Sequence, residues 1–112
     1  MSVSPTGLSI AELERDGWLV ALVEQNLRHS YTTRDLFGFV DLLALKPGRT
    51  LAVQTTTTSN QSKRVAKVLA SPHFGRVLAA GWEVHVHGWA WSRRTNDWVL
   101  TTTDLTDRRA AA

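Results

Sequence analysis

Two apolar stretches joined by a turn lie in the middle of the chain. Residues 39–45 and 50–56 are largely apolar runs interrupted by Asp41 and Gln54. The connecting sequence KPGR is a turn signal, because proline presets φ at the second turn position and glycine tolerates the positive φ of the third. The pattern predicts an antiparallel hairpin. A tight turn pairs residues whose numbers sum to 95. That register places Asp41 opposite Gln54 on one sheet face, with Cβ atoms about 5 Å apart.

The residues before this hairpin predict one helix and one strand. The S-x-x-E sequence that begins at Ser9 matches a capping box and predicts a helix over residues 9–16, which Gly17 ends. The apolar run over residues 18–25 is too short for another helix and predicts a strand. The polar stretch 26–36 reads as a loop of a length that often contacts a ligand.

The residues after the hairpin predict two helices and two more strands. An N-cap at Asn60 predicts a helix over residues 61–70, and a second helix follows over residues 73–80. Alternating residues in 82–91 and 97–103 predict a C-terminal hairpin. The order is α-β-β-β-α-(α)-β-β. The helical crossover between the third and fourth strands implies a parallel strand pair, so we predict an α/β fold with a mixed sheet.

Composition and length are those of one folded domain. The 112 residues are 43% hydrophobic and 21% charged, which predicts a single domain over residues 1–112 with flexible ends at 1–7 and 106–112. No apolar run is long enough to cross a membrane, and the first residues do not form a secretory signal, so we expect a cytoplasmic protein. The lack of cysteine excludes disulfides and thiolate chemistry.

Charge is unevenly distributed along the chain. No acidic residue lies between Asp41 and Glu83, and six lysines and arginines do. This asymmetry favours a polyanionic partner, most often nucleic acid, although a solvated basic face would have the same pattern. The residues that we expect to contact nucleic acid are Arg34, Lys63, Arg64 and Lys67.

The central pattern resembles a known nuclease motif. A strand with an Asp, a turn, a strand with (Glu/Asp/Gln)-x-(Lys or substitute) and a basic helix are similar to the PD-(D/E)XK nuclease superfamily, which includes archaeal-type Holliday junction resolvases and type II restriction enzymes. The sequence DLFGFVDLLAL…LAVQTTTTSN…R resembles a branch found in phage and bacterial genomes. Asp41 matches the motif, whereas Gln54 replaces its Glu and Thr56 replaces its Lys. The resemblance spans about residues 9–91 and implies a restriction endonuclease-like α-β-β-β-α-β core.

The resemblance implies a metal-dependent DNA endonuclease, acting on substrates that include branched or recombination intermediates. Asp41 and Gln54 would hold a Mg²⁺ or Mn²⁺ ion, with Glu24 as a third ligand if the first strand pairs with the second. Lys63 or Lys67 could replace the lysine missing at Thr56. Two alternatives remain open: a nuclease-fold DNA-binding protein with weakened or lost catalysis, and a small interaction domain. If these residues do not bind a metal, Gln54 would simply lie on an exposed edge of the sheet and Glu24 would be a surface residue at a strand end.

The C-terminal hairpin carries two further features. His85 and His87 lie on one strand face and could ligate zinc or copper, but no third ligand is in evident register. Four of the five tryptophans lie in residues 82–103, which predicts a core or a homodimer interface there. The sequence contains no GxGxxG or Walker pattern, so no nucleotide cofactor is expected.

Overall fold

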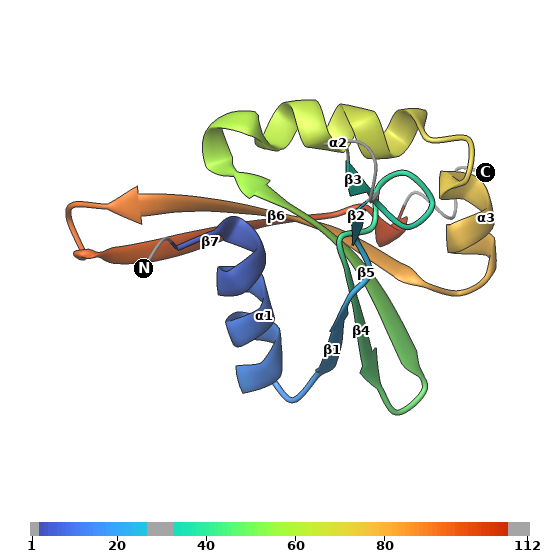
Figure 1. Ribbon diagram of the computed structural model, residues 1–112, viewed down its shortest axis with the longest axis horizontal. Helices are drawn as coiled ribbons and strands as arrows, with labels where there is room; N and C mark the ends of the chain where they lie inside the picture. Colours follow the sequence, from blue (N-terminus) through green and yellow to red (C-terminus); the bar gives the residue numbers. More distant parts are fainter. Residues whose placement is uncertain (1–2, 27–32, 108–112) are drawn as a thin grey trace.

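The computed structural model describes residues 3–26 and 33–107 (Figure 1). Its centre is a five-stranded mixed sheet with strand order β1-β4-β5-β6-β7, and β2 and β3 form a separate two-stranded ribbon. The elements are α1 (Pro5–Arg15), β1 (Leu19–Leu22), β2 (Gln25–Asn26), β3 (Thr33–Arg34), β4 (Leu42–Lys46), β5 (Arg49–Thr57), the 3-10 turn η1 (Thr58–Asn60), α2 (Gln61–Ala70), α3 (Phe74–Ala79), β6 (Glu83–Ser92) and β7 (Asp97–Asp104). The predicted α/β class with a mixed sheet is confirmed, as is the C-terminal hairpin, and the predicted element order holds apart from the added short strands β2 and β3.

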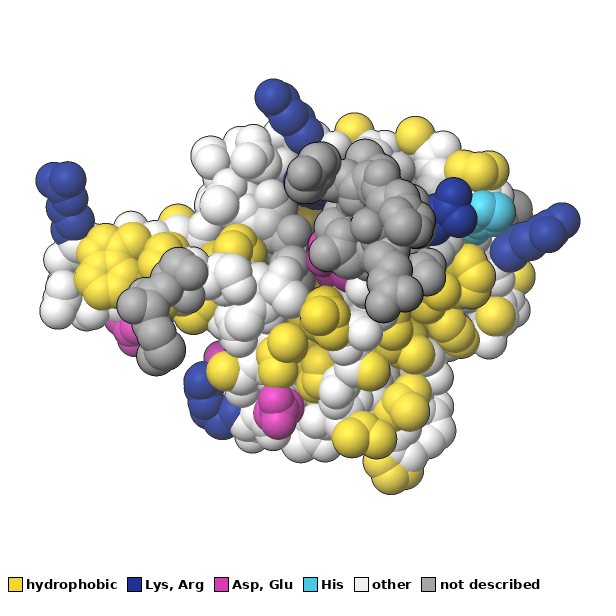
Figure 2. All heavy atoms as spheres, viewed as in Figure 1, with side chains coloured by type: hydrophobic (Ala, Val, Ile, Leu, Met, Phe, Trp, Pro, Cys, Tyr) yellow, Lys and Arg dark blue, Asp and Glu magenta, His cyan; other side chains and the backbone are white. Residues whose placement is uncertain are grey.

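Helices cover both faces of the sheet because side chains alternate along its strands. On β5, Leu51 and Val53 pack with Leu13 of α1, whereas Ala52 packs with residues of α2 and α3. Coverage stops short of one end of the sheet. Leu19 and Leu45 face each other across β1 and β4 and are exposed. Hydrophobic side chains are visible at the end of the β4–β5 hairpin in Figure 2.

The pairing of β4 with β5 has the predicted register. Partners run from Leu42 and Val53 to Lys46 and Arg49, so their numbers sum to 95. β5 then pairs in parallel with β6, as the helical crossover predicted. β4 begins at Leu42, not at residue 39 as we expected. Residues 36–40 instead form a tight turn, and this turn proves important for the site.

The first helix begins earlier than predicted. Ser4 is its N-cap, and its Oγ accepts a hydrogen bond from Gly7 N at 3.0 Å. Pro5 occupies the first turn, where its missing N–H costs nothing. The capping-box interpretation of Ser9 is wrong, because Ser9 lies buried in the middle of the helix. Residues 5–7, which we expected to be part of a flexible end, are helical.

Other predicted boundaries also change. β1 covers Leu19–Leu22 only, not residues 18–25, and the expected loop 26–36 contains the short strand β3. Residues 27–32 of that loop lie outside the described part of the chain, as do residues 1–2 and 108–112 of the expected flexible ends. Leu105 is buried against the core. None of the helices in the described ranges has the length and apolar character needed to cross a membrane.

A buried glutamine fixes the start of α2 on the sheet. Gln61 Nε2 donates to Thr101 O at 2.8 Å, to Thr103 Oγ1 at 3.1 Å and to Val86 O at 3.3 Å. Gly88 is required beneath it, because a Cβ atom there would collide with the Gln61 carboxamide. This anchor holds the start of the basic helix α2, which follows β5 and η1, against β6 and β7.

Candidate metal centre

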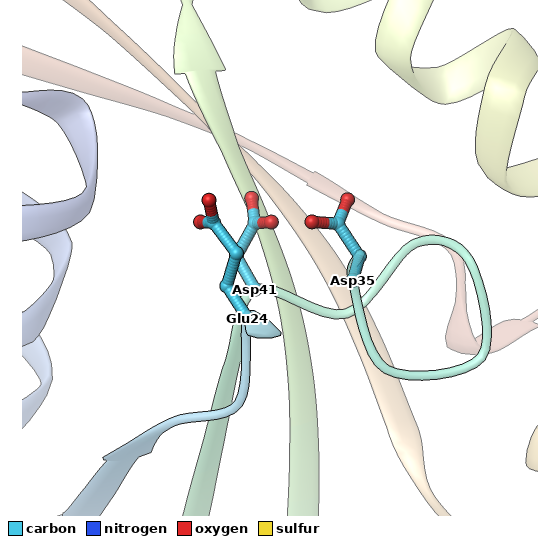
Figure 3. A group of neighbouring side chains, drawn as sticks. All are labelled: Glu24, Asp35 and Asp41. Atoms are coloured by element: carbon cyan, nitrogen blue, oxygen red, sulfur yellow. The ribbon is translucent and has the colours of Figure 1, made fainter. Parts of the chain in front are cut away.

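Three carboxylates from separate segments converge near the end of β5. Glu24 follows β1, Asp35 follows β3 and Asp41 precedes β4. One carboxylate oxygen from each lies within 4.8 Å of the others. Figure 3 shows Asp35 pointing from its loop toward Asp41 and Glu24. Like charges at this separation repel, so the group requires protons, cations or both.

Asp41 is held rigidly by the strand opposite it. Its side chain is 5% exposed, and its Oδ2 atom accepts hydrogen bonds from Gln54 Nε2 at 2.5 Å, Thr55 N at 2.9 Å and Thr55 Oγ1 at 3.3 Å. The backbone supports this placement, because Asp41 N donates to Val53 O at 2.9 Å. The predicted neighbour relation of Asp41 and Gln54 is therefore confirmed. With three donors on Oδ2, the second carboxylate oxygen is the one available to an ion.

Gln54 leaves one polar atom unsatisfied. The residue is 2% exposed, and its Nε2 donates to Asp41. Its Oε1 is buried and has no hydrogen-bond partner among the described residues. A buried carbonyl oxygen without a partner costs about 1–3 kcal/mol, so natural proteins usually supply one. Gln54 also lines a hollow of about 270 Å³ together with the three carboxylates.

The surroundings raise the pKa of Asp41 to about 7. Burial is the main cause, because a carboxylate loses the hydration that stabilises its charge. The Thr55 N–H lowers this pKa, whereas the neighbouring Asp35 and Glu24 raise it. The carboxyl group therefore stays partly protonated near neutral pH unless a cation replaces the proton.

Basic side chains border the carboxylates. Lys67 of α2 reaches the cluster, and its Nζ lies 3.1 Å from Asp35 Oδ2. Arg64, one turn earlier, lines the hollow. Lys63 is exposed on the same helix and is not among the residues lining the hollow. The structure thus brings Lys67 and Arg64 to the predicted site and leaves Lys63 at the surface.

The other two predicted site residues line this hollow and a neighbouring one. Thr56, which the sequence resemblance places at the lysine position of the motif, is buried and lines the hollow two residues after Gln54. A threonine hydroxyl cannot supply the positive charge of a lysine. Arg34 is exposed and lines a neighbouring hollow that Asp35 also lines.

Asp35 is the site residue that sequence reasoning missed. We assigned it only to a polar loop, without a role. The tight turn between Leu36 and Val40, which form an isolated β-bridge, returns the chain so that Asp35 and Asp41 lie at the same place. Gly38, with φ of 80°, was the available signal for that turn. Asp35 supplies the negative charge that Gln54 lacks.

The two histidines of β6 do not form a second metal centre among the described residues. The Glu24–Asp35–Asp41 group is the single cluster of at least three suitable ligands found there. His87 Nδ1 lies 2.9 Å from Ser9 Oγ, and burial, followed by the nearby His85, lowers the pKa of His87 to about 4. His85 Nε2 lies 3.5 Å from Asp104 Oδ2. Both rings therefore have protein partners.

Comparisons of the chain with protein-family models, with curated proteins and with solved structures found no match.

Proposed function

We propose that this protein is a metal-dependent DNA endonuclease of the PD-(D/E)XK type, which hydrolyses phosphodiester bonds at the Glu24–Asp35–Asp41 cluster. The observation that carries the proposal is the convergence of three carboxylates in a hollow that the buried, incompletely hydrogen-bonded Gln54 also lines. An array of oxygen ligands fits a hard divalent cation such as Mg²⁺ or Mn²⁺. No nucleotide cofactor is involved.

The donor set fits such an ion even though two motif positions are substituted. Asp41, Glu24 and Asp35 provide carboxylate oxygens, and Gln54 provides a carboxamide oxygen. When bound, the ion would activate water and neutralise charge that develops on the phosphate. The protein contributes the rigid placement of these oxygens, through the three donors to Asp41 and the pairing of β4 with β5.

Lys67 is our candidate for the role of the motif lysine. Neither Lys67 nor Lys63 lines the hollow of the carboxylates, but the Lys67 ammonium group lies 3.1 Å from Asp35 Oδ2. Arg64 is placed to receive a phosphate oxygen from the same side. Together with Lys63 and Arg34, these residues form the proposed DNA-binding surface of a cytoplasmic enzyme in a bacterial or phage-infected cell.

The proposed enzyme is a homodimer, because cutting both strands of a duplex takes two sites related by a two-fold axis. The tip of the β6–β7 hairpin is the candidate contact. Trp91 is 49% exposed there, and its ring packs edge-on against Trp98 with centroids 5.5 Å apart. Trp89, by contrast, is buried and donates a hydrogen bond to Ser9 within the chain, so it does not contribute to this surface.

Cleavage of labelled linear, flapped and four-way DNA with Mg²⁺, Mn²⁺ or EDTA tests the proposal. We expect cleavage with either metal and none with EDTA. Asp41→Asn should lower the rate by more than roughly a hundredfold, since even outer partners of a metal site contribute about 10- to 100-fold. Double-strand cuts in duplex DNA support the dimer, and single nicks contradict it.

Glu24→Gln and Glu14→Gln provide the matched comparison. The first removes a carboxylate from the cluster and should impair cleavage, whereas the second changes an exposed residue of α1 and should not. Cleavage that persists in EDTA or in Asp41→Asn contradicts the proposal. Salt-sensitive DNA binding without any cleavage would favour the alternative of a non-catalytic nuclease fold, to which the substitutions at Gln54 and Thr56 point.

A further inference from the structure

The turn that brings Asp35 to Asp41 contains an unusual residue at its tip. Phe37 has φ of 56° and Gly38 has φ of 80°, and Phe39 N donates to Leu36 O at 3.2 Å to close the turn. Two successive positive φ values favour asparagine or aspartate followed by glycine, and a bulky aromatic side chain is an outlier there. The Phe37 side chain is also 42% exposed. Neither local conformation nor core packing explains a phenylalanine at this position.

Phe37 is the centre of an aromatic group. Its ring centroid lies 6.1 Å from that of His73 and 5.9 Å from that of Trp82, and both pairs are tilted. Ser71 Oγ donates to Phe37 O at 3.2 Å, which ties the turn to the C-terminal end of α2. We call Phe37, His73 and Trp82 the aromatic platform. It is held in place from two sides and does not depend on a mobile loop.

The hollows around the aromatic platform and the acidic cluster share lining residues. A hollow of about 630 Å³ is lined by residues that include Asp35, Phe37 and His73. A second, mainly apolar hollow of about 360 Å³ is lined by Phe37, His73 and Trp82 among others. Asp35 also lines the hollow that the carboxylates line. The three hollows are therefore neighbours, each sharing residues with the next, and we call this series the track.

Lysine and arginine side chains line this track beside the aromatic platform. Arg34, Lys67 and Arg76 line its two outer hollows, and the one acidic residue among the described lining residues is Asp35, which is paired with Lys67. At this end of the molecule, over α3 and the end of α2, Figure 2 shows a histidine side chain between Lys or Arg side chains, with hydrophobic side chains beside it. Aromatic rings can stack with bases and cationic side chains can pair with phosphates, so this combination of groups matches the chemistry of a nucleic acid strand.

We propose that the aromatic platform binds unpaired nucleobases of a DNA strand whose phosphates lie along Arg34, Lys67 and Arg76. Bases inside a duplex are already stacked on each other, so only an unpaired segment can offer its bases to Phe37. The inference rests on the proposed nuclease function and adds a preference for duplex DNA that has an unpaired segment beside the cleaved bond, such as a flap or an overhang.

Binding in EDTA tests this proposal independently of cleavage. Fluorescence anisotropy would compare a labelled 12-nucleotide single strand, an abasic strand of equal length and a duplex. We expect the wild-type protein to prefer the base-bearing strand over the abasic one. Phe37→Asn removes the ring but suits the positive φ, so its fold should persist. It should weaken binding of the base-bearing strand by roughly 5- to 150-fold and leave abasic and duplex binding unchanged.

Two control variants complete the experiment. Phe37→Trp retains an aromatic face and should retain the preference for bases. Leu45→Asn removes a side chain that is also 42% exposed, at the β4–β5 hairpin, and should change nothing. Equal binding of base-bearing and abasic strands by the wild-type protein would overturn the proposal. So would a Phe37→Asn variant that keeps wild-type DNA binding but loses self-association in sedimentation, because the platform would then contact a second copy. If this binding pattern were observed and no DNA were cleaved, the proposed nuclease activity would be refuted and the proposed base binding would stand.

Discussion

Two buried polar groups lie on opposite faces of the same sheet, and their hydrogen bonding differs. Gln54 and Asp41 form the first group, and His87, Ser9 and Trp89 form the second. Gln54 pairs with Val86 on the face covered by α2, whereas His87, the next residue of β6, lies on the face covered by α1. Both groups are nearly inaccessible, and both contain a side chain with a strongly shifted pKa. They differ in whether the protein supplies every hydrogen-bond partner.

On the α1 face, one hydroxyl completes a network. Trp89 Nε1 donates to Ser9 Oγ at 2.8 Å, and the Ser9 hydroxyl can donate in turn to His87 Nδ1, which lies 2.9 Å away. The arrangement suits a neutral His87, whose pKa is lowered to about 4 by burial and then by the nearby His85. At Gln54, in contrast, Oε1 has no partner in the described part of the chain. The comparison teaches that burial and a shifted pKa occur in a structural network as well, and that the unsatisfied atom distinguishes the candidate site.

The largest effect on stability should come from breaking the completed network. Ser9→Ala leaves two buried groups, Trp89 Nε1–H and His87 Nδ1, without partners, and should lower the free energy of unfolding by about 2–4 kcal/mol. Urea denaturation at pH 7 would measure the loss, and metal affinity should not change. The matched control is Ser59→Ala, because Ser59 is exposed and its bond to Thr57 lies at the surface. A loss below about 0.5 kcal/mol in Ser9→Ala would refute the structural interpretation of the network.

The parts of this comparison that depend on local pattern could be predicted from the sequence. The KPGR turn determined the register of β4 with β5, which placed Asp41 beside Gln54. The pairing of β1 with β4 then placed Glu24 nearby. Asp35 was missed because Gly38 alone signals the turn that positions it, and that turn also requires phenylalanine at positive φ, which propensity argues against. Ser9 was misread for a related reason. It matches a capping box locally, but contacts with the distant strand β6 determine its role.

The acidic cluster and the histidine network should also give pH profiles of opposite sign. In EDTA, the folded protein retains a proton on Asp41 between pH 3.8 and about 7 that the unfolded chain releases, so this group makes stability fall as pH rises. His87 stays neutral when folded between about 4 and 6.5 while the unfolded chain binds a proton, so it makes stability rise with pH. Each slope is about 1.4 kcal/mol per pH unit at most, and the two oppose each other.

Asp41→Asn should separate the two slopes. In this variant, stability should still rise with pH below pH 6.5 because of His87, whereas the decrease with pH that Asp41 causes should be lost. At pH 8 we expect the free energy of unfolding of the variant to exceed that of the wild-type protein by about 1–3 kcal/mol. Urea denaturation at pH 4.5, 6.5 and 8 in EDTA would measure this. Asp97→Asn, at the exposed β6–β7 turn, is the matched control. An unchanged profile in Asp41→Asn would show that Asp41 does not retain a proton in the folded state.

The smallest expected effect is the proton released when Mg²⁺ or Mn²⁺ binds, and it distinguishes the two groups most directly. At pH 6 the ion must displace the proton of Asp41, whose pKa is about 7, whereas at pH 8 that carboxyl group is already charged. Affinity should therefore rise by up to about tenfold per pH unit below pH 7 and level off above it. Calorimetry in two buffers with different ionisation enthalpies should count close to one released proton at pH 6 and close to none at pH 8. Ser9→Ala should leave that count unchanged, since His87 stays neutral through this range. If proton release at pH 6 persisted in Asp41→Asn, the displaced proton would belong to another group, and Asp41 would not be the carboxyl that exchanges its proton for the ion.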